Sequence, residues 1–203
     1  GCTPLYMASQ EGHVEVVRAL LDRGADINQS ENDECTPLFI ASQNGHVEVM
    51  MILLERKVNV NHANKNGTTP LIIASTTNRL NAVTALIDSG ADIKMANKKG
   101  ATPLFMASHK GHVEVVRALL DRGADINQAT NLGTTLLLIA TRFGHVEVVR
   151  ALLDRGADVN QAMRNGGTRL LRESLQGHVK VARVLLDRGA NINQADNGGY
   201  TPL

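Results

Sequence analysis

The stretch GHVEVVRALLDRGAD, which occurs three times from Gly12, Gly111 and Gly144, limits the fold more than any other feature. A threonine also recurs every 33 residues from Thr3 to Thr201, with no insertion or deletion between copies. Modules repeated at such a period stack in an open row. We therefore predict one domain over residues 1–203, with six full units and the start of a seventh. The units begin near Gly1, Glu34, Gly67, Gly100, Gly133, Gly166 and Gly199.

Each unit predicts two short helices. In the first unit, Thr3 is placed to cap a helix and Pro4 to occupy its first turn, where the missing N–H does no harm. Gly12 ends that helix, and a second one follows from Val14 to about Arg23 with a valine and leucine stripe. Helices shorter than ~12–15 residues are marginal alone. Each unit should therefore depend on its neighbours for stability.

The composition fits thin aliphatic layers. Apolar residues make up 43% of the chain but aromatic residues only 2%, and the net charge is +1. A charge so close to zero gives no general attraction to nucleic acid or to an anionic membrane. The longest aliphatic run, from Leu136 to Ala140, is far below the roughly 20 residues that span a bilayer, so we predict no membrane insertion.

Cysteine usage and the first residues suggest a cellular location. Cys2 and Cys35 occupy the same place in successive units. Packed elements lie about 8–10 Å apart, whereas a disulfide needs Cα atoms within roughly 7 Å. We expect two free thiols, which suit a reducing compartment. No basic and then apolar leader opens the chain. The prediction is an intracellular, cytoplasmic protein.

The repeated motifs resemble those of the ankyrin repeat family. Four units carry TPLYMAS, TPLFIAS, TPLIIAS or TPLFMAS, and later GADIN, GADIK or GADVN appears. The resemblance implies an all-α solenoid of stacked helix-turn-helix repeats with projecting β-turns. It also implies a scaffold for protein–protein interaction that is seldom catalytic. The family's histidine after T-P-L is replaced, by Tyr6 in the first unit for example, so we expect an apolar contact in its place.

The residues do not suggest an enzyme, a metal site or a cofactor. The sequence contains no G-x-S-x-G, no phosphate-binding G-x-x-x-x-G-K-[ST] and no H-E-x-x-H motif. Five histidines, including His112 and His145, follow in phase after a glycine or its equivalent. In-phase residues lie about 10 Å apart and zinc ligands about 2 Å from one ion, so these histidines should be structural.

Positions that differ between units and are exposed can specify a partner. Two sets qualify, namely the tips of the turns and the ends of the first helices, and the resemblance places both on the concave side. The candidate binding residues are Asp33, Lys65, Asn66, Lys98, Lys99, His109, Lys110, Leu132, Arg142, Phe143 and Arg164. We expect a protein or peptide partner to bind them.

Charge along this surface is uneven. The first units offer acidic residues such as Glu11 and Glu34, and the middle units offer lysine and arginine. The hypothesis is an acidic partner region on units three to five, with Phe143 and Arg142 as the main anchor. Three alternatives stay open: variation of surface residues without any function, nucleic-acid binding through the basic residues of the middle units, and a role as a regulatory or targeting arm of a larger enzyme.

Several positions break the pattern. Lys57 replaces a glycine and should cost about 1 kcal/mol if its φ is positive. Asn78 replaces another glycine and tolerates the same conformation. In unit six, Arg169 replaces the proline and Glu173 a small alanine, and the two are expected to pair on one helix. We expect unit six to be the loosest full unit.

The two ends of the array show no polar capping unit. Solenoids need such units for solubility. Two explanations stay open: a longer array, or end-to-end stacking on a second copy. The near-identity of three units likewise fits either recent duplication or a consensus-style design.

Overall fold

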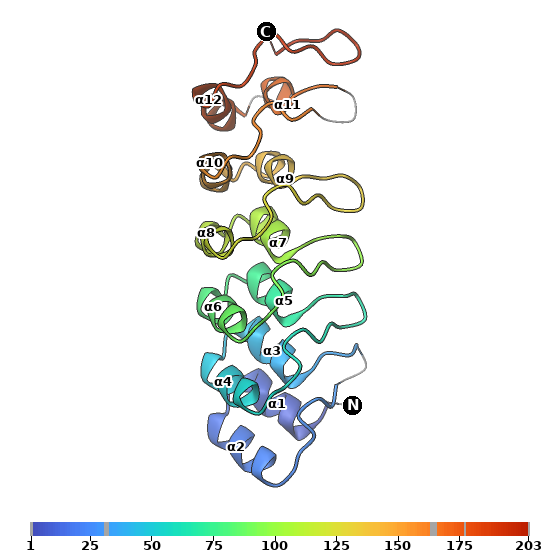
Figure 1. Ribbon diagram of the computed structural model, residues 1–203, viewed down its shortest axis with the longest axis vertical. Coiled ribbons are helices and arrows are strands. Elements are labelled where there is room, and N and C mark those ends of the chain that lie inside the picture. Colours follow the sequence, from blue (N-terminus) through green and yellow to red (C-terminus); the bar gives the residue numbers. More distant parts are fainter. Residues whose placement is uncertain (1, 31–32, 163–165, 177, 203) are drawn as a thin grey trace.

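The computed structural model describes residues 2–30, 33–162, 166–176 and 178–202, and within these ranges every regular element is an α-helix (Figure 1). The first helices of the six units are here called the inner helices. They are α1 Pro4–Glu11, α3 Pro37–Asn44, α5 Pro70–Thr76, α7 Pro103–Lys110, α9 Leu136–Arg142 and α11 Arg169–Gln176. The second helices, called the outer helices, are α2 Val14–Asp22, α4 Val47–Glu55, α6 Leu80–Asp88, α8 Val113–Asp121, α10 Val146–Asp154 and α12 Val179–Asp187.

The helix pairs stack in a single row, and the loops between units project from one side (Figure 1). Each inner helix contacts the next inner helix, and each outer helix contacts the next outer helix. One leucine row runs through the core at the 33-residue interval: Leu5, Leu38, Leu71, Leu104, Leu137 and Leu170 are each at most 3% exposed. The predicted all-α solenoid is confirmed. Among the described residues, no helix has the length and apolarity that crossing a bilayer requires.

The predicted helix limits are also confirmed. The Thr3 hydroxyl accepts the Tyr6 N–H at 3.2 Å, and Gly12 ends the helix with a φ of 74°. In units one to four, the side chains that stand in place of the family's histidine are buried: Tyr6 and Phe39 pack in one apolar cluster, and Ile72 is 1% exposed. In these units an apolar contact therefore takes the place of the family's histidine, as the sequence indicated.

The connections before α5 and α7 end in β-turns held by an asparagine. In the turn before α7, the Gly100 N–H donates to the Asn97 carbonyl at 2.8 Å, and the Asn97 side chain accepts from the N–H groups of Lys99 and Ala101. Neighbouring tips bond to each other, because the Lys98 N–H donates to the Asn66 carbonyl at 3.0 Å. The projecting turns thus form an ordered row.

Three of the recurring histidines, His46, His112 and His145, clamp their unit to the previous one. Nε2 of His46 lies 2.9 Å from the Gln10 carbonyl oxygen, and Nε2 of His112 lies 3.0 Å from the Thr76 carbonyl oxygen. A carbonyl only accepts, so each ring donates, and each satisfies a backbone group that the end of a helix leaves open. Arg79 does the same through Nε, 3.1 Å from the Gln43 carbonyl. The expectation that these histidines are structural is met by this geometry.

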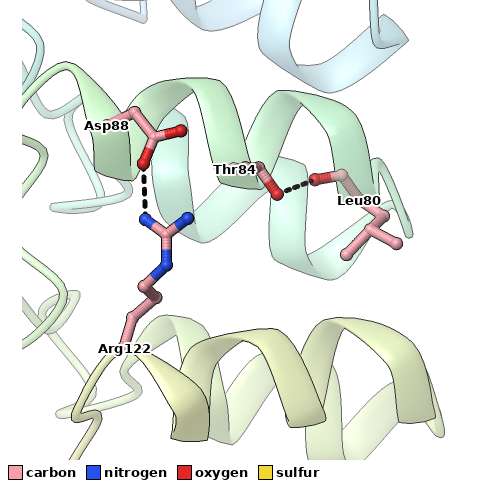
Figure 2. A network of polar contacts seen from close by, with 4 residues as sticks. All are labelled: Leu80, Thr84, Asp88 and Arg122. Carbon is pink, nitrogen blue, oxygen red and sulfur yellow. Dashed lines mark hydrogen bonds and ion pairs between the residues drawn. The ribbon is translucent and has the colours of Figure 1, made fainter.

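A second row of contacts, on the outer helices, was missed in the sequence. Asp88 forms an ion pair with Arg122 at 2.5 Å (Figure 2), and Asp22 forms one with Arg56 at the same distance. Each aspartate lies 34 residues before its arginine, an interval that the sequence shows. Both partners are largely exposed, so each pair contributes about 0–1 kcal/mol.

Lys57 has a φ of 59°, as the sequence predicted, and its strain can be tested separately from packing. At the equivalent Gly123 (φ +83°), an added Cβ would meet no atom within 4 Å. We expect Lys57→Gly to stabilise unit two by about 1 kcal/mol and Gly123→Lys to destabilise unit four by a similar amount. Each substitution removes or adds a side chain at a positive φ, so the strain of that conformation is what changes. Hydrogen exchange of α4 and α8 amides measures both. Unchanged exchange in both variants would contradict the prediction.

Unit six departs from the expected pairing. Arg169 and Glu173, which are 2% and 0% exposed, form no ion pair with each other. Instead, His178 Nδ1 lies 2.5 Å from Glu173 Oε2, because a buried carboxylate needs a donor more than a helix-end carbonyl does. His178 therefore does not make the clamp of its counterparts. Burial lowers the pKa of Arg169 to about 10, nearby Arg172 lowers it as well, and Glu173 partly opposes both.

Candidate functional site

The structure places the predicted binding residues in two rows. The tip row contains Asp33, Lys65, Asn66, Lys98, Lys99 and Leu132, all exposed on the projecting turns. The helix-end row contains His109, Lys110, Arg142 and Phe143, at the ends of α7 and α9. Arg164 lies outside the described residues. An inner helix of about eight residues separates the rows, which corresponds to about 12 Å along its axis.

The tip row is basic in the middle of the array. Lys65, Lys98 and Lys99 are exposed, and none of them forms an ion pair among the residues that the structure describes. The hydrogen bonds between adjacent turns fix the backbone at these positions: the Lys65 N–H donates to the Asp33 carbonyl at 3.1 Å. Leu132, at the tip between units four and five, is 77% exposed. The row therefore offers positive charge on an ordered backbone.

The helix-end row contains a cluster of aromatic rings from units four and five. The His109 ring centroid lies 4.7 Å from that of Phe143, and the Phe143 centroid lies 6.2 Å from that of His145. The ring centroid of Phe105, which is buried in α7, lies 6.5 Å from that of His109. Phe143 itself is 50% exposed. We call His109, Phe143 and His145 the ring cluster.

The surroundings of the ring cluster are positive. The Arg142 guanidinium carbon lies 5.9 Å from the Phe143 ring centroid. Burial lowers the pKa of His109, and its neighbours Lys110, His145 and Arg142 lower it further. His109 is therefore neutral at pH 7 and adds an uncharged ring. Neither Lys110 nor Arg142 forms an ion pair within the described part of the chain.

Sequence reasoning found Phe143 and Arg142 but not the part played by His145. We had assigned His145 to structure alone, and it does clamp unit five through Nε2, 2.9 Å from the His109 carbonyl. That same bond holds its ring beside Phe143. The signal was available in principle, because residues about 34 apart in a stack of this period lie next to each other.

The first units carry the opposite charge on the same rows. Glu11 ends α1 and is exposed, and Asp33 and Glu34 are exposed at the first described tip. The exposed charge along the two rows therefore changes from acidic in the first units to basic in the middle units. No group of three or more metal-ligating side chains gathers among the described residues.

Comparisons with known proteins give the family. A model of ankyrin repeats in three copies matches residues 5–97 and 90–163, and a single ankyrin repeat model matches residues 171–197. A search of curated proteins finds no match to this chain. The family matches cover most of the sequence and coincide with the stacked helix pairs of the structure. The chain therefore belongs to the ankyrin repeat family.

Proposed function

We propose that this array is a non-catalytic scaffold whose tip row and helix-end row, in units three to five, bind an acidic region of a protein or peptide partner. Ankyrin repeats generally serve as protein–protein interaction modules. The observation that supports the finer proposal is the run of five exposed cations without a carboxylate partner: Lys65, Lys98, Lys99, Lys110 and Arg142. Complementary charge steers association and suppresses wrong partners.

Several arginines elsewhere on the molecule differ from these cations because they already form ion pairs. Arg56 and Arg122 each bind an aspartate of the previous unit, and Arg150 lies 3.6 Å from Glu147. Their charge is already compensated within the array. The five cations of the two rows keep their charge, as do Arg18, Arg117 and Arg183 on the outer helices. The rows differ from the outer helices in position, because their cations stand where the units vary, on the turn tips and the inner-helix ends, and there they can attract an acidic partner.

Charge reversal tests the proposal. The Lys98→Glu, Lys99→Glu, Lys110→Glu triple variant should lose binding to an acidic heptapeptide, whereas its melting temperature should barely change because exposed substitutions usually alter stability by at most about 0.5 kcal/mol. The matched control reverses Arg18, Arg117 and Arg183, which are exposed on outer helices. Both variants change the net charge equally, so only the place of the charge differs. Fluorescence anisotropy measures the affinity.

If both triple variants bound the acidic heptapeptide with equal affinity, the proposed surface would be wrong, because the loss of affinity would then depend only on net charge. The same assay includes a labelled single-stranded oligonucleotide at physiological salt. Proteins that bind such strands stack successive bases on several aromatic side chains, whereas Phe143 is the one exposed ring of phenylalanine, tyrosine or tryptophan on units three to five as described. We expect no binding of the oligonucleotide, and tight binding would support the nucleic-acid alternative instead.

A further inference from the structure

The ring cluster is specific to one junction in the array. Positions equivalent to Phe143 carry Glu11, Asn44, Thr77 and Lys110 in the earlier units, and positions equivalent to His109 carry glutamine, threonine, arginine or leucine in the other units. The stack therefore brings two variable rings into contact between units four and five. This contact leaves half of the Phe143 side chain exposed to solvent.

The cluster is held in place from both sides. His145 is fixed by its Nε2 bond to the His109 carbonyl, and Phe105 lies against His109 from within the same helix. The rings of His109 and Phe143 are tilted by 57°, and those of Phe143 and His145 are nearly parallel at 17°. A surface ring that is already ordered loses little conformational entropy on binding.

We infer that the ring cluster receives an aromatic side chain of the partner, while carboxylates on either side of that side chain bind Lys110 and Arg142. This inference rests on the proposed function and names the chemistry that the partner must present. Aromatic pairs prefer tilted or offset contacts at centroid distances of 4.5–7 Å and gain beyond the area that they bury. The exposed part of Phe143 offers such a contact, and the two cations beside it are unpaired in the described structure.

The charged groups around His109 also link this contact to pH. Lys110 lies beside it on α7, Arg142 is on α9, and His145 caps α10, and all three oppose its protonation. A carboxylate placed among them would favour the charged imidazole instead. Binding should therefore take up a proton, and the affinity should rise as the pH falls from above the pKa of His109 in the complex toward its lowered pKa in the free chain.

Three synthetic heptapeptides test the inference with the intact chain. They are Glu-Asp-Glu-Trp-Glu-Asp-Glu, the same peptide with alanine for tryptophan, and the same peptide with lysine for every acidic residue. In amide NMR titrations, we expect the acidic tryptophan peptide to bind about tenfold more tightly than either of the others. The largest shifts should fall on His109, Phe143 and His145. Phe143→Ala should reduce the affinity for the tryptophan peptide to that for the alanine peptide.

The pH arm follows the His109 ring resonances with and without saturating tryptophan peptide. Its pKa should be higher in the complex, and His109→Gln should remove the extra affinity gained between about pH 7.5 and about pH 5.5. Thermal melts establish that each variant folds. Phe143 is half exposed and lies beyond the last residue of α9, so its removal should leave the fold intact.

The outcomes separate the two proposals. If both acidic peptides bind equally well and shift mainly Lys98 and Lys99, the ring cluster is no aromatic site but the acidic surface stands. If the lysine peptide with tryptophan binds as well as the acidic one, the assignment of carboxylates to Lys110 and Arg142 is wrong. If neither acidic peptide binds, both the proposed function and this inference fail.

Discussion

Val115→Asp is expected to destabilise the middle of the array by about 4 kcal/mol or more, whereas Val16→Asp should cost less than about 1 kcal/mol. The two valines occupy the same place in identical fifteen-residue stretches. Val115 is fully buried, while Val16 is 48% exposed because no unit of this chain covers that face of α2. Local sequence is therefore held constant, and only the neighbouring unit differs.

The pair of variants measures how much of a unit's stability comes from its neighbours. An apolar core position that receives a carboxylate must bury a charge or protonate it, and both are costly. At Val16 the carboxylate stays in water. Val148, 1% exposed in the third copy, should behave like Val115. Circular dichroism melts and hydrogen exchange of α7 and α8 provide the measurement.

Equal effects at Val16 and Val115 would contradict the stacked arrangement on which the fold rests. Such a result would mean that the identical stretches are equally buried, by a second copy for instance. Sedimentation of the unmodified chain distinguishes that case, since end-to-end stacking, one of the two alternatives left open by the sequence, would appear as a mass that grows with concentration.

The fold was predictable from sequence because its information is local and repeated. Threonine before proline fixes where an inner helix begins, and a glycine such as Gly12 fixes where it ends. The 33-residue interval then determines which faces meet. Even the positive φ of Lys57 and Asn78 follows from the glycine that each replaces.

The candidate site was predictable only in part, because the 33-residue repeat does not determine which rotamers the side chains at the junction between two units adopt. Exposure of Phe143 and Lys98 follows from their variability. The contact of Phe143 with His109 and His145 depends on which rotamers the two helix ends allow. In unit six, two acceptors compete for His178, and the local spacing alone favoured an Arg169 and Glu173 pair that the structure does not form.

The second large effect is expected in unit six, where the double substitution Arg169→Pro with Glu173→Ala should stabilise the unit by about 1–4 kcal/mol. Four other units have proline at this first helical position, and alanines such as Ala74 and Ala107 occupy the place of Glu173 with no exposure. The change removes buried polar atoms without hydrogen-bond partners, namely Arg169 Nε, Arg169 Nη1 and Glu173 Oε1. Each such group costs about 1–3 kcal/mol.

The single variants should not add up to the double one. Glu173→Ala alone removes the carboxylate that offsets the burial of the Arg169 charge, so it should destabilise the unit. It also releases His178, which can then donate to a carbonyl of unit five as its counterparts do. The transplant into unit three, Pro70→Arg with Ala74→Glu, is the reverse control and should loosen that unit.

Hydrogen exchange of α12 amides, compared with those of α8, reads out the effect. In the unmodified chain α12 should exchange faster, and in the double variant the difference should shrink, because unit six then packs with the apolar atoms that the other units use. The ion pair between Arg188 and Asp154 is retained on the outer helices, so the loosening concerns the inner side of the junction. Exchange in α12 as slow as in α8 before any substitution would show that the buried Arg169 and Glu173 are tolerated at no cost. The loss of the His178 clamp would then have no bearing on how firmly unit six is held beside the ring cluster.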